Sequence, residues 1–527
     1  MAVATSRTIA LQGATGHLID VQVDVSPGMV ATIMVGRPDA AISEARDRCR
    51  MAVSNSGFAW PTTRRTTILL SPADLPKRGT HFDLAIAVAV LAAAVDPRKD
   101  APIPTDDALF LGELTLAGAL RPVPGVLPMV LAAASHGIRR VFVPEPQAAE
   151  AALVPDVAVF GMRSLAQVVA ELRGLEVPEA PPVAAESGSR LLSWRGQERL
   201  EEGDLADLVG IGEAVYAAEV AAAGGHHLLL RGPKGSGKTT LAERIPSILP
   251  DLDHEEALEL TAIHSLAGGP AATTLIRRPP YLAPHHGASQ ASILGGGSGR
   301  ARPGAVSRAH SGVLFLDEFP LFSSTVVQGL REPLESGEVT IARGEETATF
   351  PARALVVLAA NPCPCGERDS GTGACTCPSV KLRTYQEKLE GPVADRVDIL
   401  RDVRPPPRGS GSSPVPVTTS ADARARVTAA RQRQAKRYAG ASWRLNGHAP
   451  GAALRAAWPL EEKSAQLVEQ HVDDGLLTRR GATRVHRLAW TVADLAGSSE
   501  PGLRDVEVAL ALRLGDPLPA ALVERAG

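Results

Sequence analysis

The stretch with the clearest chemistry is GPKGSGKT, which fits the pattern G-x-x-x-x-G-K-[ST] in full. The apolar segment HHLLLR precedes it and the helical pattern TLAERIPSIL follows it. In this setting glycines let backbone N–H groups surround phosphates, a lysine adds charge at the β- and γ-phosphates, and a hydroxyl ligates Mg²⁺. The sequence therefore predicts a site for ATP and Mg²⁺ made by Gly232, Pro233, Lys234, Gly235, Ser236, Gly237, Lys238 and Thr239.

Two further apolar segments end in polar side chains that nucleotide hydrolysis needs. GVLFLDE ends in Asp317 and Glu318, and RALVVLAAN ends in Asn361. We expect Asp317 to hold Mg²⁺ with Thr239, Glu318 to polarise the attacking water, and Asn361 to orient that water against the γ-phosphate. Because the carboxyl ends of parallel strands share one edge of a sheet, these side chains should meet the phosphate loop there.

Four of the five cysteines lie within fifteen residues, directly after this asparagine, in the stretch NPCPCGERDSGTGACTCPS. Their spacing is C-x-C, nine residues, C-x-C, which differs from the common C-x-x-C zinc knuckle. In a reducing compartment, four thiols on a polar loop favour tetrahedral Zn²⁺, with free thiols as the alternative. We therefore predict a structural zinc site, dispensable to the chemistry, at Cys363, Cys365, Cys375 and Cys377.

The composition places these motifs in a globular chain. Of its 527 residues, 44% are hydrophobic and 21% are charged, and the formal net charge is −3. A nucleic-acid partner must therefore be met by a local basic patch rather than by a global field. The sequence shows neither the apolar core of a secretory signal nor an apolar run long enough for a membrane span, so we expect a cytoplasmic protein with no membrane contact.

Two stretches rich in proline, glycine and serine divide the chain and are interpreted as linkers, at 175–192 and 404–420. The first segment, 1–174, has the pattern of an α+β module. In the second, 193–403, apolar strands alternate with helices, which is typical of an α/β fold with a parallel sheet. The third, 421–527, is helical by pattern.

The motifs together resemble a known family. The phosphate loop, LDE, AANP, GPVADRVDI and TRRGATRVHRLAWTVADLAG are similar to the AAA+ ATPases of the magnesium chelatase group, and most closely to their ComM/YifB subfamily. APHHGASQASILGGGSGRARPGAVSRAHSGVLFLDE matches that subfamily almost residue by residue, and the resemblance covers nearly the whole chain. It implies a P-loop AAA+ core followed by an α-helical lid.

The same resemblance implies roles for two arginines. Arg396 in ADR resembles the arginine finger, and Arg480 in TRRG resembles the sensor 2 arginine at the start of a lid helix. A guanidinium binds phosphate in a bidentate manner and neutralises charge in the transition state. Because an arginine finger is supplied to a neighbouring subunit, the resemblance implies a hexameric ring. The alternative for each arginine is a surface salt bridge.

The first segment resembles the proteolytic domain of Lon protease, in FLGELTLAGALRPVPGVLPMVLAAASHGIRRVFVP. Where the protease has its nucleophilic serine, this chain has PKRGTHFDL, with His81 or Phe82 near the serine's place, and the region of the lysine partner, GVLPM, contains no lysine. Without a nucleophile and a base, this region cannot hydrolyse a peptide bond by nucleophilic catalysis. We expect a non-proteolytic module for assembly or DNA contact.

Two further patterns, a basic stretch and a pair of histidines, each have more than one interpretation. Residues 424–444 carry seven cations and no acid, with Tyr438 and Trp443 among them. This pattern is typical of a helix that neutralises phosphates and stacks bases, and equally of a solvated basic face or a subunit contact. His285 and His286, beside a glycine-rich run, either face a threaded substrate or pack against the ATPase core.

The resemblance implies an ATP-driven motor acting on DNA, with branch migration or helicase activity on recombination intermediates in natural transformation or DNA repair. One alternative is an accessory ATPase for metal insertion, as in magnesium chelatase; the Lon-like first segment argues against it. A second alternative is a chaperone-like protein remodeller, against which the basic stretch argues modestly. The motif residues themselves predict only ATP hydrolysis, and leave the substrate and the direction of movement open.

Overall fold

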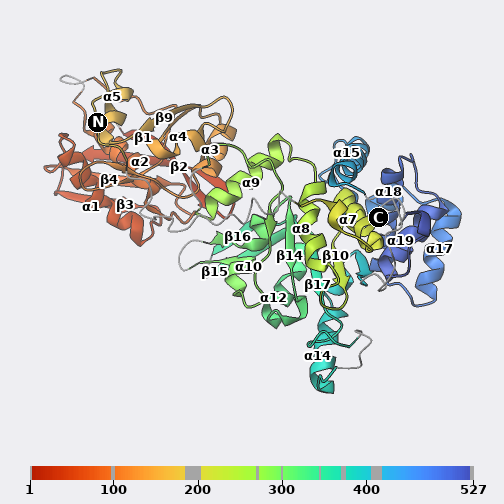
Figure 1. The fold of residues 1–527 in the computed structure, drawn as a ribbon. Helices are drawn as coiled ribbons and strands as arrows, with labels where there is room; N and C mark the ends of the chain where they lie inside the picture. Colours follow the sequence, from red (N-terminus) through yellow and green to blue (C-terminus); the bar gives the residue numbers. More distant parts are fainter. Residues whose placement is uncertain are drawn as a thin grey trace.

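The computed structural model describes residues 3–96, 101–183, 203–268, 272–297, 301–343, 346–368, 375–404 and 418–522. Within them, three regions follow one another along the chain, with the N-terminal region at one end and the C-terminal helices at the other (Figure 1). Residues 175–183 of the first predicted linker have no regular structure. The rest of that linker, and residues 405–417 of the second, lie outside the described residues.

The N-terminal region is a seven-stranded mixed sheet, in the order β3-β4-β2-β1-β5-β8-β9. Apolar cores lie on both faces: α1 and α2 cover one, and α3 covers the other. α1 begins after Asp39, whose side chain accepts a hydrogen bond from the backbone N–H of Ile42. The bounds are β1 Ala4–Gln12, β2 Thr15–Ser26, β3 Ala31–Val35, α1 Ala40–Asn55, β4 Arg65–Ser71, α2 Asp83–Ala94, β5 Ala108–Phe110, β6 Glu113–Leu114, β7 Leu120–Arg121, α3 Val126–Ser135, β8 Arg140–Pro144, α4 Ala148–Ala151, β9 Ala158–Met162 and α5 Leu165–Leu172.

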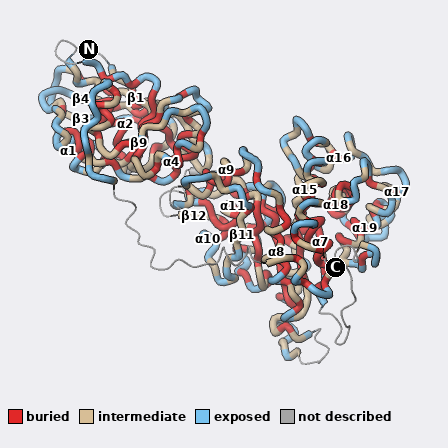
Figure 2. The backbone as a smooth tube through the Cα atoms, turned by 45° about the horizontal axis from the view of Figure 1, so that its top comes forward, coloured by how far each residue is buried: buried red, intermediate tan, exposed pale blue. Residues whose placement is uncertain are grey.

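The central region is built on a five-stranded parallel sheet in the order β11-β14-β17-β10-β18, as the alternation of strands and helices predicts. β14 and β17 are buried along their whole length, and successive residues face two different apolar cores. The bounds are α7 Gly212–Gly224, β10 Leu228–Arg231, α8 Lys238–Ile248, α9 His254–Leu266, β11 Tyr281–Leu282, α10 Gln290–Leu294, β12 Gly295–Gly296, β13 Arg302–Pro303, α11 Ala305–Arg308, β14 Val313–Leu316, α12 Ser324–Gly329, α13 Arg331–Ser336, β15 Glu338–Arg343, β16 Glu346–Pro351, β17 Leu355–Ala360, α14 Ser379–Leu389 and β18 Ile399–Asp402. Figure 2 shows the buried backbone gathered in this region and in the N-terminal sheet.

The C-terminal region is helical, as predicted. Its helices are α15 Ser420–Arg437, α16 Gly451–Ala457, α17 Glu462–Asp473, α18 Arg479–Ala496 and α19 Leu503–Leu514. α15 and α18 pack against α7, so the lid shares one apolar core with the sheet. Among the described residues, no helix combines the length and the apolar character that crossing a bilayer requires.

The N-terminal region docks on the central one through α9 and the β15–β16 hairpin. α3 lies against α9, and Ala262 of α9 belongs to the apolar core beneath α3. Ser265 of α9 donates a hydrogen bond of 2.5 Å to the buried carboxylate of Glu150. The backbone N–H of Ala14, after β1, donates to the carbonyl of Thr349 in β16. The first region is therefore packed on the central region.

Candidate ATP site and lid interface

The phosphate loop leaves the carboxyl end of β10 and leads into α8. Gly237 caps α8 with φ of +91°, a conformation that a residue with a side chain rarely adopts. At Gly232 a methyl group would stand 2.1 Å from the carbonyl oxygen of Val403, so this position admits only glycine. The first turn of α8 thus presents free backbone N–H groups toward the position that a phosphate would take.

Lys238 points back into this loop. Its Nζ donates to the carbonyls of Gly232 and Pro233, each at 2.8 Å, and to Asn361 Oδ1 at 3.3 Å. Burial lowers the pKa of Lys238, while the nearby Asp317 carboxylate opposes that shift. The sequence-predicted lysine and asparagine are therefore in contact, although 123 residues separate them in the chain.

Asp317 and Thr239 are also brought together. The Thr239 hydroxyl donates to Asp317 Oδ2 at 3.1 Å, and Asp317 Oδ1 accepts from the backbone N–H of Glu318 at 2.8 Å. Glu318 has φ of +49°, which is uncommon for a residue other than glycine and occurs at sites where a side chain is held in a fixed direction. A hydroxyl and a carboxylate at this separation are the oxygen ligands that Mg²⁺ prefers.

The donor set therefore fits ATP with Mg²⁺. Lysine and the N-terminus of α8 would hold the phosphates, Thr239 and Asp317 would ligate the metal ion, and Glu318 and Asn361 lie at the ends of adjacent strands beside them. This fit concerns the geometry of the side chains; their individual roles in catalysis remain predictions.

His286 adds a contact to this site that the sequence alone did not locate. Its Nδ1 lies 3.6 Å from Glu318 Oε2, and its ring lies 4.0 Å from that of His285, centroid to centroid. His286 is partly buried beside Glu318, whereas His285 is exposed, so both interpretations of the pair stay predictions. The sequence does not show that His286 lies near Glu318. The structure does, because β11, which precedes the histidines, pairs with β14, which precedes the acids.

Arg396 and Arg480 lie elsewhere. Both contact one carboxylate, that of Glu335: Arg396 Nη2 at 2.7 Å and Arg480 Nη2 at 3.5 Å. Hydrogen bonding from Arg396, with the charges of both arginines, lowers the pKa of Glu335. The Arg396 side chain is 14% exposed and that of Arg480 is 59% exposed.

The register of β18 shows how far these arginines are from the phosphate loop. β18 runs parallel to β10, with Ile399 opposite Leu228 and Asp402 opposite Arg231. Arg396 precedes the amino end of β18, whereas the phosphate loop follows the carboxyl end of β10. The two lie on opposite edges of the sheet, separated by roughly 13 Å of strand. Neither arginine reaches its own chain's phosphate loop.

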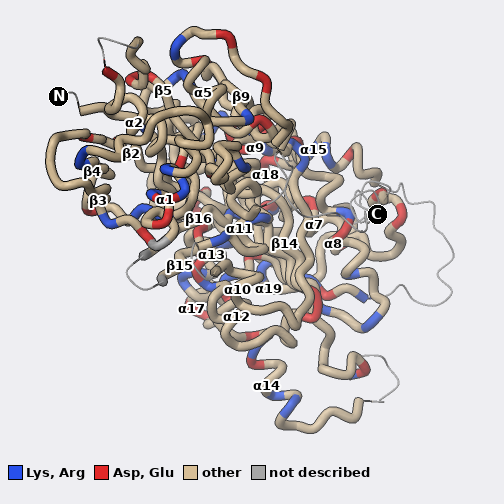
Figure 3. Tube along the Cα trace, turned by 90° about the vertical axis from the view of Figure 1, so that its left-hand side faces the viewer, with Lys and Arg blue, Asp and Glu red and all other residues tan. Residues whose placement is uncertain are grey.

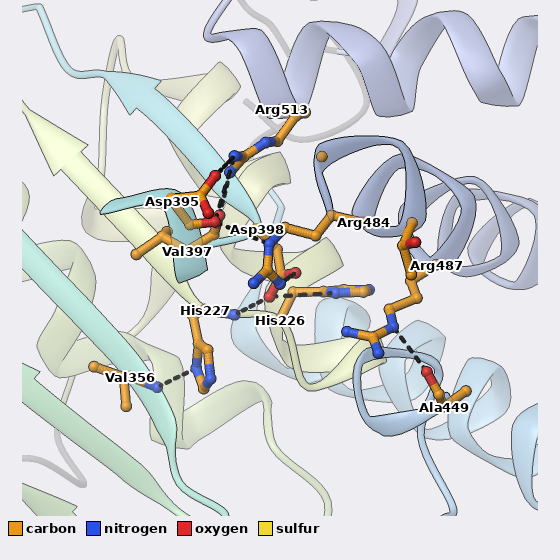
Figure 4. A network of polar contacts seen from close by, with 12 residues as sticks. His226, His227, Val356, Asp395, Val397, Asp398, Ala449, Arg484, Arg487 and Arg513 are labelled. Atoms are coloured by element: carbon orange, nitrogen blue, oxygen red, sulfur yellow. Dashed lines mark hydrogen bonds and ion pairs between the residues drawn. The ribbon is translucent and has the colours of Figure 1, made fainter. Parts of the chain in front are cut away.

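A buried polar network fixes the lid beside this amino edge (Figure 4). Arg484, one turn after Arg480 on α18, donates to Asp398 Oδ1 at 3.0 Å, and their side chains are 11% and 4% exposed. Asp398 Oδ2 accepts from the backbone N–H of His227 at 3.0 Å. Burial alone would raise the pKa of Asp398, but Arg484 and the two neighbouring histidines hold it well below its usual range. Arg513 of α19 donates to the carbonyl of Val397.

The four predicted zinc ligands gather in space. The Sγ atoms of Cys363, Cys365, Cys375 and Cys377 all lie within 4.8 Å of one another, and none forms a disulfide. Cys363 Sγ lies 3.3 Å from Cys365 Sγ and 3.7 Å from Cys375 Sγ, and the latter two are 3.7 Å apart. Zn–S bonds of about 2.3 Å place tetrahedral sulfurs about 3.8 Å apart, so the arrangement fits the ion.

The basic stretch 424–444 is mostly committed to contacts inside the chain, a role that neither interpretation of its sequence pattern included. Its aromatic residues pack in a small apolar core, where Tyr438 is buried and Trp443 is partly buried. Acidic and cationic segments are interspersed over this part of the molecule (Figure 3). Six of its seven cations bind a carboxylate or a backbone carbonyl of the chain: Arg424, Arg426, Arg431, Arg433, Arg437 and Arg444.

The position of the Lon nucleophile is occupied by structural side chains. His81 is 3% exposed and its Nε2 hydrogen-bonds with the carbonyl of Ile9 at 2.8 Å, while Phe82 is fully buried. Asp83 is buried and forms a bidentate ion pair with Arg48, at 2.9 and 3.0 Å. These contacts support the expectation of a non-proteolytic module.

Comparison with known families covers the same three regions. The family described as magnesium chelatase, subunit ChlI, matches residues 204–410, its C-terminal family matches residues 417–513, and the family described as subunit ChlI of Mg-chelatase matches residues 21–147. YifB of Escherichia coli is 38% identical over 519 residues, which is 98% of each chain. The chain belongs to the ComM/YifB family of magnesium-chelatase-like proteins. It is thus an AAA+ ATPase of this family, for which ATP and Mg²⁺ are implied.

Two other relatives match nearly the whole chain, and a third matches only part of it. Competence protein ComM of Haemophilus influenzae is 37% identical over 502 residues, 95% of each chain, and an uncharacterized protein of Mycobacterium tuberculosis is 44% identical over 514 residues, 97% of this chain and 99% of that one. The magnesium-chelatase 38 kDa subunit of Rhodobacter capsulatus is 28% identical over only 26% of this chain.

Proposed function

We propose that this ATPase is a hexameric ring motor that acts on branched or single-stranded DNA, with branch migration or helicase activity on recombination intermediates. Two observations support the DNA substrate. Similarity to competence protein ComM spans 95% of the chain, whereas similarity to a magnesium chelatase subunit spans 26%. A 95-residue segment is also 40% identical to DNA repair protein RadA of Salmonella typhimurium. The metal-insertion alternative is supported by the magnesium chelatase families that match all three regions, but the chelatase subunit itself matches only 26% of the chain.

The proposal of a ring rests on one observation: the phosphate loop and the two arginines lie on opposite edges of the central sheet. Lys238, Asp317 and Glu318 lie at the carboxyl edge, and Arg396 and Arg480 lie at the amino edge, both on Glu335. A chain arranged in this way completes an ATP site only when a neighbour supplies the arginines. Such a head-to-tail contact generates a closed ring when its rotation closes.

In the proposed reaction, Lys238 and the N-terminus of α8 bind the phosphates, and Glu318 accepts a proton from the attacking water that Asn361 orients. Mg²⁺, held by Thr239 and Asp317, would neutralise charge on the phosphates. The arginines of the neighbour stabilise the charge that develops in the transition state.

A mixing experiment tests the ring. Lys238→Ala and Arg396→Ala chains are each expected to be inactive. In randomly mixed rings, half the phosphate loops are intact and half of their neighbours carry the finger, so about a quarter of the wild-type ATPase rate should return. If Arg396 served its own chain, every chain would lack one group and mixing would restore nothing.

The DNA substrate has its own test. We expect four-way or forked DNA to bind and to raise the ATPase rate at low salt, with Lys238→Ala as the inactive control. A protein whose ATPase rate is unchanged by branched and single-stranded DNA, and which binds neither at low salt, would not be a DNA motor. Stimulation by a protein partner instead would favour the remodeller.

We also propose that the four-cysteine cluster holds a structural Zn²⁺. The support is the fit of four thiol sulfurs to the edge lengths of a tetrahedron, on a loop that has no disulfide among its described residues. Metal analysis of the protein purified under reducing conditions tests this site. Four titratable thiols without metal would reject it.

A further inference from the structure

The four-cysteine loop and helix α14, to which it leads, lie next to the ATP site, although the sequence predicts the metal of this loop to be dispensable to the chemistry. In Figure 1, α14 projects from the body of the central region. Only Tyr385 of this helix is buried, so α14 has almost no apolar surface with which to hold itself in place. We infer that metal bound by the four cysteines clamps α14 onto the ATP site and thereby sets the positions of Asn361 and of the segment after Glu318. The inference rests on the proposed ATPase and zinc sites.

The first contact of this clamp is with Asn361. The hydroxyl of Tyr385 donates to the carbonyl of Asn361 at 3.1 Å, and this bond is buried. Cys363, two residues after Asn361, is fully buried. The asparagine is thus fixed from one side by α14 and from the other by a metal ligand, while its own Oδ1 faces Lys238.

The second contact is with the segment that follows the catalytic acids. Lys388 Nζ donates to the carbonyls of Pro320 and Phe322, each at 2.9 Å. These two residues follow Glu318 by two and four positions, in the segment after β14. α14 therefore ties the carboxyl ends of β14 and β17 to each other, which fixes the spacing between the acids and the asparagine.

The third contact is with the phosphate loop itself. The Lys234 side chain packs over Gly366, where a methyl group would meet its carbons at 3.0 to 3.2 Å. The backbone N–H of Gly366 donates to the carbonyl of Cys363 at 3.0 Å, which makes the tight turn between the first pair of cysteines. A bound metal would fix this turn against the loop that holds the phosphates.

In this proposal the metal is needed to hold α14 in place, because the segment that connects α14 to Asn361 is long. Between Asn361 and the start of α14 lie seventeen residues, 362–378, rich in glycine and polar side chains. Without a cross-link, such a segment gains conformational entropy when it moves away from the core, and a metal clip removes most of that gain. Loss of the metal would therefore free α14 and release all three contacts together.

The experiment uses the full chain and Zn²⁺ as the probe. We expect about one zinc ion per wild-type chain, and visible absorption of tetrahedral cobalt–thiolate when Co²⁺ replaces it. The double variant Cys375→Ser/Cys377→Ser should lose the metal, weaken binding of a non-hydrolysable ATP analogue, and lower kcat at least about tenfold. Cys49→Ala, which removes the fifth thiol in the distant N-terminal region, should keep both metal and rate.

A second variant separates positioning from folding. Tyr385→Phe should retain the metal and nearly unchanged ATP affinity but lose about fivefold in kcat, the equivalent of one hydrogen bond. If the cysteine variant does not fold, the wild-type chain is treated with a zinc-selective chelator in excess Mg²⁺; its rate should fall and return when Zn²⁺ is added.

The outcomes are distinguishable. A metal-free chain with wild-type kcat and ATP affinity overturns the clamp while leaving the zinc site and the ATPase standing. A wild-type chain that takes up no zinc overturns the zinc site and the clamp with it. Loss of ATPase in Lys238→Ala, measured alongside, tests the proposed ATPase independently of either.

Discussion

The ion pair between Asp398 and Arg484 is expected to hold the lid against the sheet. In Asp398→Asn the side chain keeps its shape but leaves the buried guanidinium without its counter-charge. At 3.0 Å and with both side chains nearly inaccessible, breaking such a pair costs about 3–5 kcal/mol. The acceptor of the His227 N–H is retained as an amide oxygen, so the loss is mainly electrostatic.

The same strand offers a matched control. Asp402 at the other end of β18 forms an ion pair with Arg231 at 2.9 Å, with side chains 37% and 42% exposed. Solvent screens this pair, so Asp402→Asn should cost less than about 1 kcal/mol. Two identical substitutions, four residues apart on one strand, are thus expected to differ by several kcal/mol in their effect on the lid.

Hydrogen exchange of the α18 amides is the suitable assay, because a chain with several regions has no single free energy of unfolding. A cost of about 3 kcal/mol corresponds to exchange in α18 that is more than about a hundredfold faster in Asp398→Asn. Adding Arg484→Met should recover part of the loss, since no charge is then left unpaired. Equal exchange in the Asp398 and Asp402 variants would refute the reasoning.

Three further predictions concern other parts of the structure. Burial lowers the pKa of His226 to about 4 and that of His448 to about 3, below the ordinary value of 6.5. The folded chain therefore protonates these histidines at a lower pH than the unfolded chain does. The apparent Tm should fall as the pH drops from about 6.5 toward 4. Gly232→Ala should abolish binding of an ATP analogue, measured by titration, because its methyl group would collide with the carbonyl of Val403 after β18 and displace the phosphate loop. Arg426→Ala leaves the buried carboxylate of Glu219 in α7 unpaired, a cost of about 2 kcal/mol that should speed hydrogen exchange of the α7 amides about thirtyfold. Replacing the exposed Lys436 of α15 by alanine should leave this exchange unchanged.

The ATP site could be predicted from the sequence because its residues follow apolar segments of a kind that form parallel strands. Lys238, Asp317 and Asn361 each stand at the end of such a segment, and the sheet brings them together. The basic stretch was different: seven cations with no acid among residues 424–444 left several interpretations open, and partners such as Glu219, about 200 residues away in the chain, could not be foreseen. Local charge patterns do not reveal such long-range pairing.

The positions of Arg396 and Arg480 relative to the sheet could not be predicted from the sequence either. Their motifs identify the kind of residue, but only the register of β18 against β10 shows on which edge Arg396 lies. The gathering of four cysteines was predicted, whereas their contact with Lys234 and the role of α14 required the fold. A loop of this length does not specify which neighbour it packs against.

The short strand β18 has a mechanical consequence. Just before its amino end, Asp398 binds Arg484 of the lid. Just past its carboxyl end, the backbone N–H of Val403 donates to the carbonyl of Arg231, and the carbonyl of Val403 contacts Gly232. A strand that is hydrogen-bonded along its length scarcely stretches, so the five residue steps from Asp398 to Val403 transmit a displacement over about 17 Å. In the proposed ring, a tilt of the lid against a neighbouring chain would be transmitted through β18 to the backbone beneath the phosphate loop.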